Sequence, residues 1–222
     1  VHIAQNLRHD KLGNVFDNAF FDAQEPPLDM PRWGTELRFL NLLAKQLKAA
    51  REVVRGKPEN FNRPDYNFSL VKSPDASALP NGDEEVDITA RPRGSNLDLV
   101  VAEAMILANS TWGQWLGALG VPGIYRSQAS MAPGVKVRMG TKMAPHAGIG
   151  VAAYAWSTSP LRRYTDLVNQ WQLLACVQHG STAALAAPFK PKDAELFAIV
   201  SGFEATYSAY SQFQNAMERY WT

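Results

Sequence analysis

The sequence has one cysteine, no long apolar run and almost no net charge. Because Cys176 is alone, no disulfide can form within the chain, which is typical of a reducing compartment. No stretch reaches the ~18 consecutive apolar residues that a membrane-spanning helix needs. The first residues also lack the basic-then-apolar layout of a signal peptide. These absences predict a cytoplasmic protein without a membrane partner, in which Cys176 packs inertly in the core.

The charges nearly cancel, with 22 basic against 21 acidic residues and a formal net charge of +1. Such a balance creates no overall field that would attract a nucleic acid or a membrane surface, so any site for a polyanion must be local. The hydrophobic content of 46% and the aromatic content of 10% are typical of a packed globular protein.

Helical spacing of apolar residues predicts two long helices in the first half of the chain. One runs from Thr35 to Arg55 and ends at Gly56. The other runs from Leu97 to about Leu119, with Asn96 as its cap, and its broad apolar face predicts a position deep in the core.

The second half of the chain contains two further predicted helices. One begins at Ser159 and stops near Gly180. The other begins at about Lys192 and places on one side the apolar residues Leu196, Val200, Phe203, Tyr207, Tyr210 and Met217.

Alternating apolar residues predict strands between these helices. The stretches "RPDYNFSLV" and "EEVDITARP" form a hairpin-like pair, "VPGIYRS" reads as a short strand, and Val135 to Arg138 as another. The simplest architecture is one α+β unit with mixed strands and several long buried helices.

The stretch "SPLRRYTDLVNQ" places two arginines where a helix is expected to start. Ser159 can cap the helix and Pro160 suits its first position. Arg162 and Asp166 are then neighbours at i,i+4, and a surface ion pair of about 0.3–0.5 kcal/mol is one interpretation. The other is a bound phosphate, because a helix start and a guanidinium favour the same anion. Both interpretations are open at this point.

The longer stretch "YAWSTSPLRRYTDLVNQ" resembles the signature of the ribonuclease II and ribonuclease R (RNB) exoribonuclease family. "LDLVVAEAMILAN", followed by "LGVPGIYR", is similar to that family's buried helix and the strand after it. "RPDYNFSLV" and "QNAMER" stand in the family's order as well, so the resemblance runs from about Leu7 to Arg219. It implies an RNB-like catalytic unit that degrades single-stranded RNA from its 3′ end and releases nucleoside 5′-monophosphates.

The resemblance also implies magnesium, which the family binds at an aspartate motif of the type D-x-x-x-x-x-D-x-D-D. No such motif occurs in this sequence, and the acidic cluster "DEEVD" from Asp83 to Asp87 stands where the family has a hairpin strand. In the family the motif precedes everything found here. Residues 1–222 are therefore interpreted as the C-terminal part of an RNB domain, without the magnesium ligands, whose missing front is a candidate partner.

Matched residue by residue, the signature assigns roles to several side chains. Arg162 holds the RNA phosphate near the scissile bond, while Asp166 and Glu218 complete the expected catalytic set. The expected RNA-binding set is Arg163, Tyr164, Glu103, Tyr154 and Trp156.

Alternatives stay open for four of these residues and for the chain. Glu103 and Glu218 can instead have structural roles, and Tyr154 and Trp156 can be core aromatics rather than base-stacking platforms. The alternative to an enzyme is a non-catalytic RNA-binding chain or an inactive fragment.

Overall fold

The structure is a computed structural model that describes residues 6–7, 12–13, 15–59, 65–71, 82, 84–91 and 94–221. Its elements are α2 (Asn18–Asp22), α3 (Gly34–Arg55), β1 (Asp65–Leu70), β2 (Val86–Arg91), α4 (Asn96–Ala118), β3 (Tyr125–Ser127), β4 (Arg138–Gly140), α5 (Tyr164–His179), the 3₁₀ turn η1 (Gly180–Thr182), α6 (Ala183–Ala186) and α7 (Ala194–Trp221). The predicted α+β class is confirmed, with long helices dominating two short antiparallel sheets in the described ranges.

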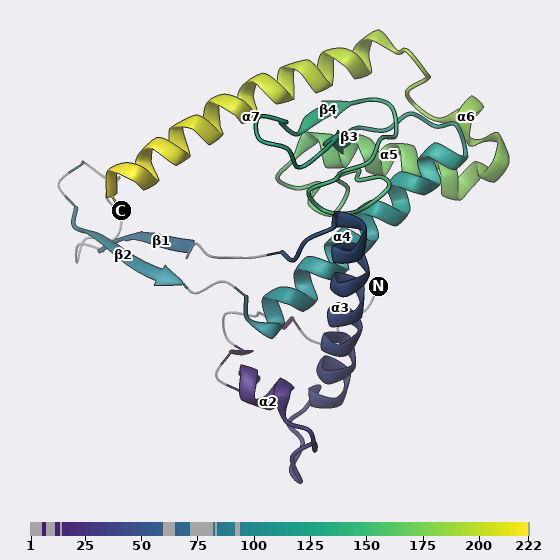
Figure 1. Cartoon of the computed structure of the whole chain (residues 1–222). Coiled ribbons are helices and arrows are strands. Elements are labelled where there is room, and N and C mark those ends of the chain that lie inside the picture. The colour runs from purple at the N-terminus through teal and green to yellow at the C-terminus, as the bar shows by residue number, and fades with distance from the viewer. Residues whose placement is uncertain are drawn as a thin grey trace.

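The helices α3 and α4 pack against each other, with α2 near the start of α3 and most of the remaining helices and strands beyond the other end of α4 (Figure 1). There α5, α6 and the β3–β4 pair gather around the C-terminal part of α4. The long helix α7 runs across this group and contacts both α5 and β4. This arrangement brings the start of α5, the strand β3 and the middle of α7 into one region.

Three buried clusters hold the elements together. The first joins α4 to α5 through Leu116, Tyr125, Ala155 and Cys176, and it confirms the prediction that Cys176 packs in the core. The other two join α7 to α5 (Ile124, Val168, Phe189, Leu196, Val200) and α2 to α3 and α4 (Phe16, Phe21, Leu37, Leu97).

The long helix α4 departs from the prediction in its cap and its depth. Ser95 caps it, not Asn96, and its hydroxyl accepts a hydrogen bond from the Asp98 N–H. Its C-terminal half is buried around Leu116, but Val101 is 46% exposed and Leu107 is 47% exposed. The expectation that the whole helix lies deep in the core is therefore wrong, because α3 covers only one side of it.

The predicted hairpin is confirmed, since β1 pairs with β2 in an antiparallel register that sets Phe68 opposite Ile88. The second pair differs in its bounds, because β4 begins at Arg138 rather than Val135 and sets Met139 opposite Arg126.

The acidic cluster's Asp83 lies outside the described residues.

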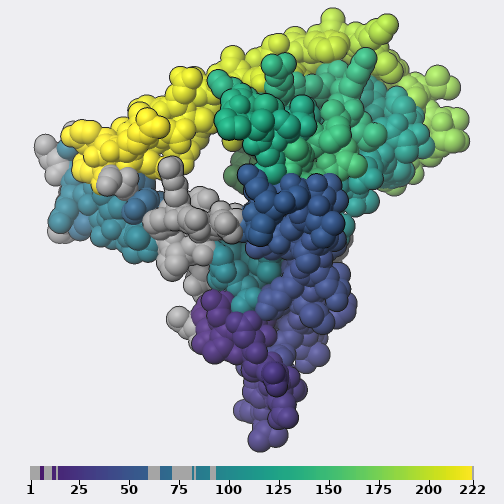
Figure 2. All heavy atoms as spheres, viewed as in Figure 1, coloured from purple at the N-terminus to yellow at the C-terminus, as the bar shows by residue number. Residues whose placement is uncertain are grey.

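The last helix begins at Ala194, two residues after the predicted start, because Asp193 accepts the N–H groups of Glu195 and Leu196. Leu196 and Val200 are buried as expected, but Tyr210 is 63% exposed. Figure 1 and Figure 2 show why: the C-terminal half of α7 leaves the main body of the molecule. Among the described helices, none has the length and apolar character needed to cross a membrane.

Candidate functional site

The helix α5 begins at Tyr164, so the predicted start at Ser159 is wrong. Residues 159–163 form a turn in which the N–H groups of Arg162 and Arg163 donate to the Ser159 carbonyl at 3.2 and 3.1 Å. Arg163 occupies the cap position without a side-chain cap bond. The physical reason is the Asp166 carboxylate, which accepts the Ser159 N–H at 2.9 Å and folds the turn back onto the helix.

Asp166 is fully buried and pairs with Arg163, not with Arg162. The Arg163 guanidinium donates Nε to one carboxylate oxygen at 2.9 Å and Nη2 to the other at 2.8 Å. This bidentate pair at i,i+3 replaces the expected surface pair at i,i+4. Arg163 is thereby held in one geometry.

Arg162 is left facing solvent beside the start of α5. Its side chain is exposed, and it makes no hydrogen bond or ion pair with any residue that the structure describes. Tyr164 is also half exposed, with its ring edge-on to Trp171 at 6.1 Å. The turn therefore presents one paired arginine and one arginine available to an anion.

Buried amides fix the segment that precedes this turn. Asn169 of α5 donates to the carbonyls of Trp156 and Ile124, and its own oxygen accepts the Ile124 N–H at 2.7 Å. Asn109 of α4 accepts the Ser157 N–H at 2.9 Å. Trp156 is thus positioned between α4 and α5.

The Trp156 ring is in contact with two arginines. The guanidinium carbon of Arg126 is 4.0 Å from the ring centroid and that of Arg163 is 4.1 Å from it. Tyr207 of α7 meets the same ring edge-on at 5.8 Å. These contacts leave Trp156 only 6% exposed, so stacking on a base would require an arginine to move away.

Tyr154 is 8% exposed, and its ring lies edge-on to His146 at 5.9 Å. Burial, together with the nearby charge of Arg126, lowers the pKa of His146 to about 4, so this imidazole is neutral near pH 7. Both rings are packed inside the fold, and a base-stacking role for Tyr154 would need a rearrangement.

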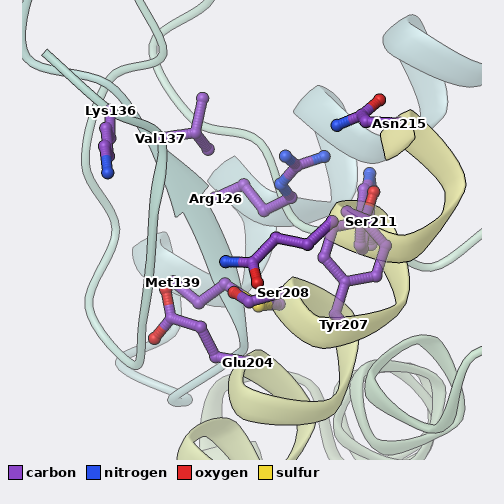
Figure 3. A pocket seen from close by; sticks show the side chains of 11 residues that line it. Arg126, Lys136, Val137, Met139, Glu204, Tyr207, Ser208, Ser211 and Asn215 are labelled. Atoms are coloured by element: carbon purple, nitrogen blue, oxygen red, sulfur yellow. The ribbon is translucent and has the colours of Figure 1, made fainter. Parts of the chain in front are cut away.

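A cleft of about 420 Å³ lies between β3, the β4 region and the middle of α7 (Figure 3). Arg126, Trp156 and Lys136 are among the residues that line it. Arg126 is not among the site residues predicted from the sequence. A single arginine in a short strand does not indicate a binding site from the sequence. The position of Arg126 beside Trp156 and α7 follows only from the fold.

The two glutamates that the sequence singled out lie in different places. Glu103 is 2% exposed and forms a buried ion pair with Arg51 of α3, away from the cleft lining. Glu218 accepts a hydrogen bond from Gln214 and lies one helical turn beyond Asn215, which lines the cleft. Of the two glutamates, only Glu218 therefore lies on the face of α7 that lines the cleft.

A magnesium site is not formed by the described residues, among which no group of three or more His, Cys, Asp or Glu side chains could hold a metal ion. The carboxylate oxygens of Asp166 accept hydrogen bonds from the Arg163 guanidinium and from the Ser159 N–H. Asp166 therefore holds the turn in this arrangement and does not serve as a metal ligand.

Comparison with known proteins points to one family. Residues 135–179 match the RNB domain model. An uncharacterized ribonuclease of Synechocystis is 32% identical over 47% of this chain, and exoribonuclease 2 of Actinobacillus succinogenes is 42% identical over 24% of it. The matches span only 19% and 7% of those two relatives' own lengths.

Two solved structures share the fold. An active-site mutant of the Dss1 exoribonuclease from Candida glabrata matches 95% of this chain and 29% of its own, with a TM-score of 0.69 and 20% identity. Mycoplasma genitalium RNase R, in complex with double-stranded RNA, matches 88% of this chain and 40% of its own, with a TM-score of 0.54 and 14% identity. The chain is thus similar to part of two ribonucleases, matches the RNB domain over residues 135–179, and shares its fold with part of these two exoribonucleases.

Proposed function

We propose that this chain is the phosphate-binding part of an RNB-type exoribonuclease, which hydrolyses single-stranded RNA from the 3′ end to nucleoside 5′-monophosphates. The observation that carries the proposal is the exposed, unpaired guanidinium of Arg162 at the start of α5, within the described chain. The ribonuclease relatives and the exoribonuclease folds support the same class of reaction.

The geometry of the turn suits a phosphodiester. A helix start offers backbone N–H groups and partial positive charge, and a guanidinium donates to phosphate oxygens through its planar fork. Because Asp166 holds Arg163 and closes the turn, Arg162 projects from a rigid base. In this proposal Arg162 contacts the phosphate under attack and stabilises the charge that develops on it.

The other residues have supporting roles in the proposal. Arg163 and Asp166 position the turn, Tyr164 borders it, and Glu218 faces the substrate from α7. The magnesium expected from the resemblance would be bound by the family's aspartate motif, which this sequence does not contain. RNA is the proposed partner, together with the aspartate-bearing part of an RNB domain.

The test is the Arg162→Ala variant in a polypeptide that carries this chain together with an RNB aspartate motif. We expect turnover of single-stranded RNA to fall by at least about 100-fold, because one donor to the transition state is lost. The dissociation constant for the same RNA should change little, as should both quantities in the control variant Lys142→Ala, which alters an exposed cation elsewhere.

Two other outcomes would change the assignment. An equal loss of binding and rate would make Arg162 a general backbone clamp. Full turnover by the variant would show that the proposed role is wrong.

A further inference from the structure

The cleft beside Trp156 is built from segments that are far apart in the sequence. Its walls are β3, the stretch leading into β4, and one face of α7 (Figure 3). The lining residues are Arg126, Lys136, Val137, Met139, Trp156, Glu204, Tyr207, Ser208, Ser211, Gln212 and Asn215. The turn that carries Arg162 adjoins it, because Arg163 rests on the same Trp156 ring.

Arg126 is a half-buried cation without a counter-ion. Arg163 has the Asp166 carboxylate, but Arg126 makes no ion pair with any carboxylate of the described chain, and its close contact is the Trp156 ring. Burial lowers the pKa of Arg126, and the like charge of Arg163 acts in the same direction, against the opposing effect of Tyr207 and Tyr154. A bound anion would relieve both costs.

The opposite wall offers uncharged hydrogen-bond donors. Ser208, Ser211 and Asn215 follow one another at intervals of three and four residues, so they share one face of α7. Lys136 adds a second cation to the lining, and this one is exposed. The cleft's carboxylate, Glu204, lies apart from the Arg126 guanidinium in Figure 3. One guanidinium, one ammonium and several hydroxyl and amide donors suit a phosphate group.

We propose that this cleft binds a backbone phosphate of the RNA strand next to the nucleotide held at Arg162, with Arg126 as its main contact. The inference rests on the proposed function, since it places a second phosphate subsite on the same strand. Arg126 and Arg163 share one tryptophan ring, so the two subsites belong to one rigid unit.

The experiment measures binding of a 5′-fluorescein oligoribonucleotide to the full chain by anisotropy over a series of salt concentrations. For Arg126→Met we expect about tenfold weaker binding, because a charged contact is lost. The slope of log affinity against log salt should also become shallower by about 0.7, the value for one contact to a single-stranded phosphate. Lys142→Met, at an exposed cation outside the cleft, should bind like the unmodified chain.

Arg126→Met also removes the contact of Arg126 with the Trp156 ring, so a second variant that keeps Arg126 is needed. Ser211→Asp adds a negative charge on the α7 wall and should weaken RNA binding about tenfold, whereas Ser211→Asn, of the same shape as the aspartate but uncharged, should not. Ala209→Asp places the same charge on the opposite face of α7 and should have little effect.

The outcomes are distinguishable. If the unmodified chain does not bind the RNA, the proposed function and this inference both fail. If it binds, and Arg126→Met and Ser211→Asp bind equally well with the same salt slope, only this inference is wrong. If Arg126→Met changes competition by inorganic phosphate but not the RNA affinity, the cleft is a site for free phosphate, and the assignment to RNA is overturned.

Discussion

At the residue scale, the two adjacent arginines of the signature have opposite environments. The Arg163 guanidinium has two partners, the Asp166 carboxylate and the face of the Trp156 ring. Arg162, one residue earlier, has no partner among the described side chains and faces solvent. One arginine therefore holds the turn together, while the guanidinium of the other is exposed, as the proposed phosphate contact requires.

The buried pair predicts the effect of Asp166→Asn. Loss of the charge would leave the Arg163 guanidinium, whose side chain is 17% exposed, without a full partner. We expect the free energy of unfolding, measured with urea, to fall by about 3 kcal/mol. Asp22→Asn, which breaks the exposed pair with Lys45, should cost less than about 1 kcal/mol. Equal effects of the two substitutions would contradict this account of the turn.

His146 predicts a loss of stability in mild acid. Its pKa is about 4 in the folded chain and near 6.5 when unfolded, so between these values the unfolded state binds the additional proton. Stability should therefore fall as the pH drops from about 6.5 to about 4, by on the order of 3 kcal/mol. Urea unfolding at pH 7 and pH 4.5 measures the change. His146→Gln should remove most of that pH dependence, and an unchanged dependence would show that other groups cause it.

At the element scale, α5 supports the site through its buried amides. Asn169→Ala would leave the carbonyls of Trp156 and Ile124 and the Ile124 N–H without partners in a fully buried place. Since each such group costs about 1–3 kcal/mol, we expect a loss of at least 3 kcal/mol in urea unfolding. Gln170→Ala loses one bond, to the Ser157 carbonyl, and should cost about 1 kcal/mol. A smaller loss for Asn169→Ala than for this neighbour would refute the assignment.

Local chemistry made some elements predictable. The C-terminus of α3 follows from Gly56, whose φ of 77° suits glycine, and the β1–β2 hairpin follows from alternating apolar residues. The start of α5 was mispredicted because Ser159 and Pro160 favour a helix start locally, while the Asp166 carboxylate binds the Ser159 N–H from the first turn of the helix. A contact across seven residues outweighed the local preference.

At the scale of the whole molecule, the cleft could not be predicted because it joins Arg126 to α7 residues about eighty positions later. The pattern of apolar residues in β3 and in α7 does not predict that these two elements meet. The signature motifs predict that the turn of residues 159–163 binds phosphate, and this role stays a prediction. The sequence assigns Arg162 and Arg163 to different roles, but it pairs Asp166 with Arg162 rather than with Arg163, whose guanidinium packs on Trp156.

The buried pair between Arg51 and Glu103 links α3 to α4 and makes a prediction about Glu103. Glu103→Gln should lower the free energy of unfolding by about 3 kcal/mol, because Arg51 would lose a partner in the interior. Glu59→Gln, which removes the more exposed second partner, should cost less. The RNA affinity of folded Glu103→Gln should equal that of the unmodified chain, and a loss would restore the substrate role that the signature implies.

The most direct test of the central claim uses this chain and a 5′-labelled single-stranded RNA. Binding is measured alongside degradation, with magnesium in one series and EDTA in the other. The account predicts that the RNA binds in both series and is not shortened by this chain alone, because it supplies the phosphate-binding part of the site. A magnesium-dependent ladder shortening from the 3′ end, or no binding by the folded chain, would contradict it.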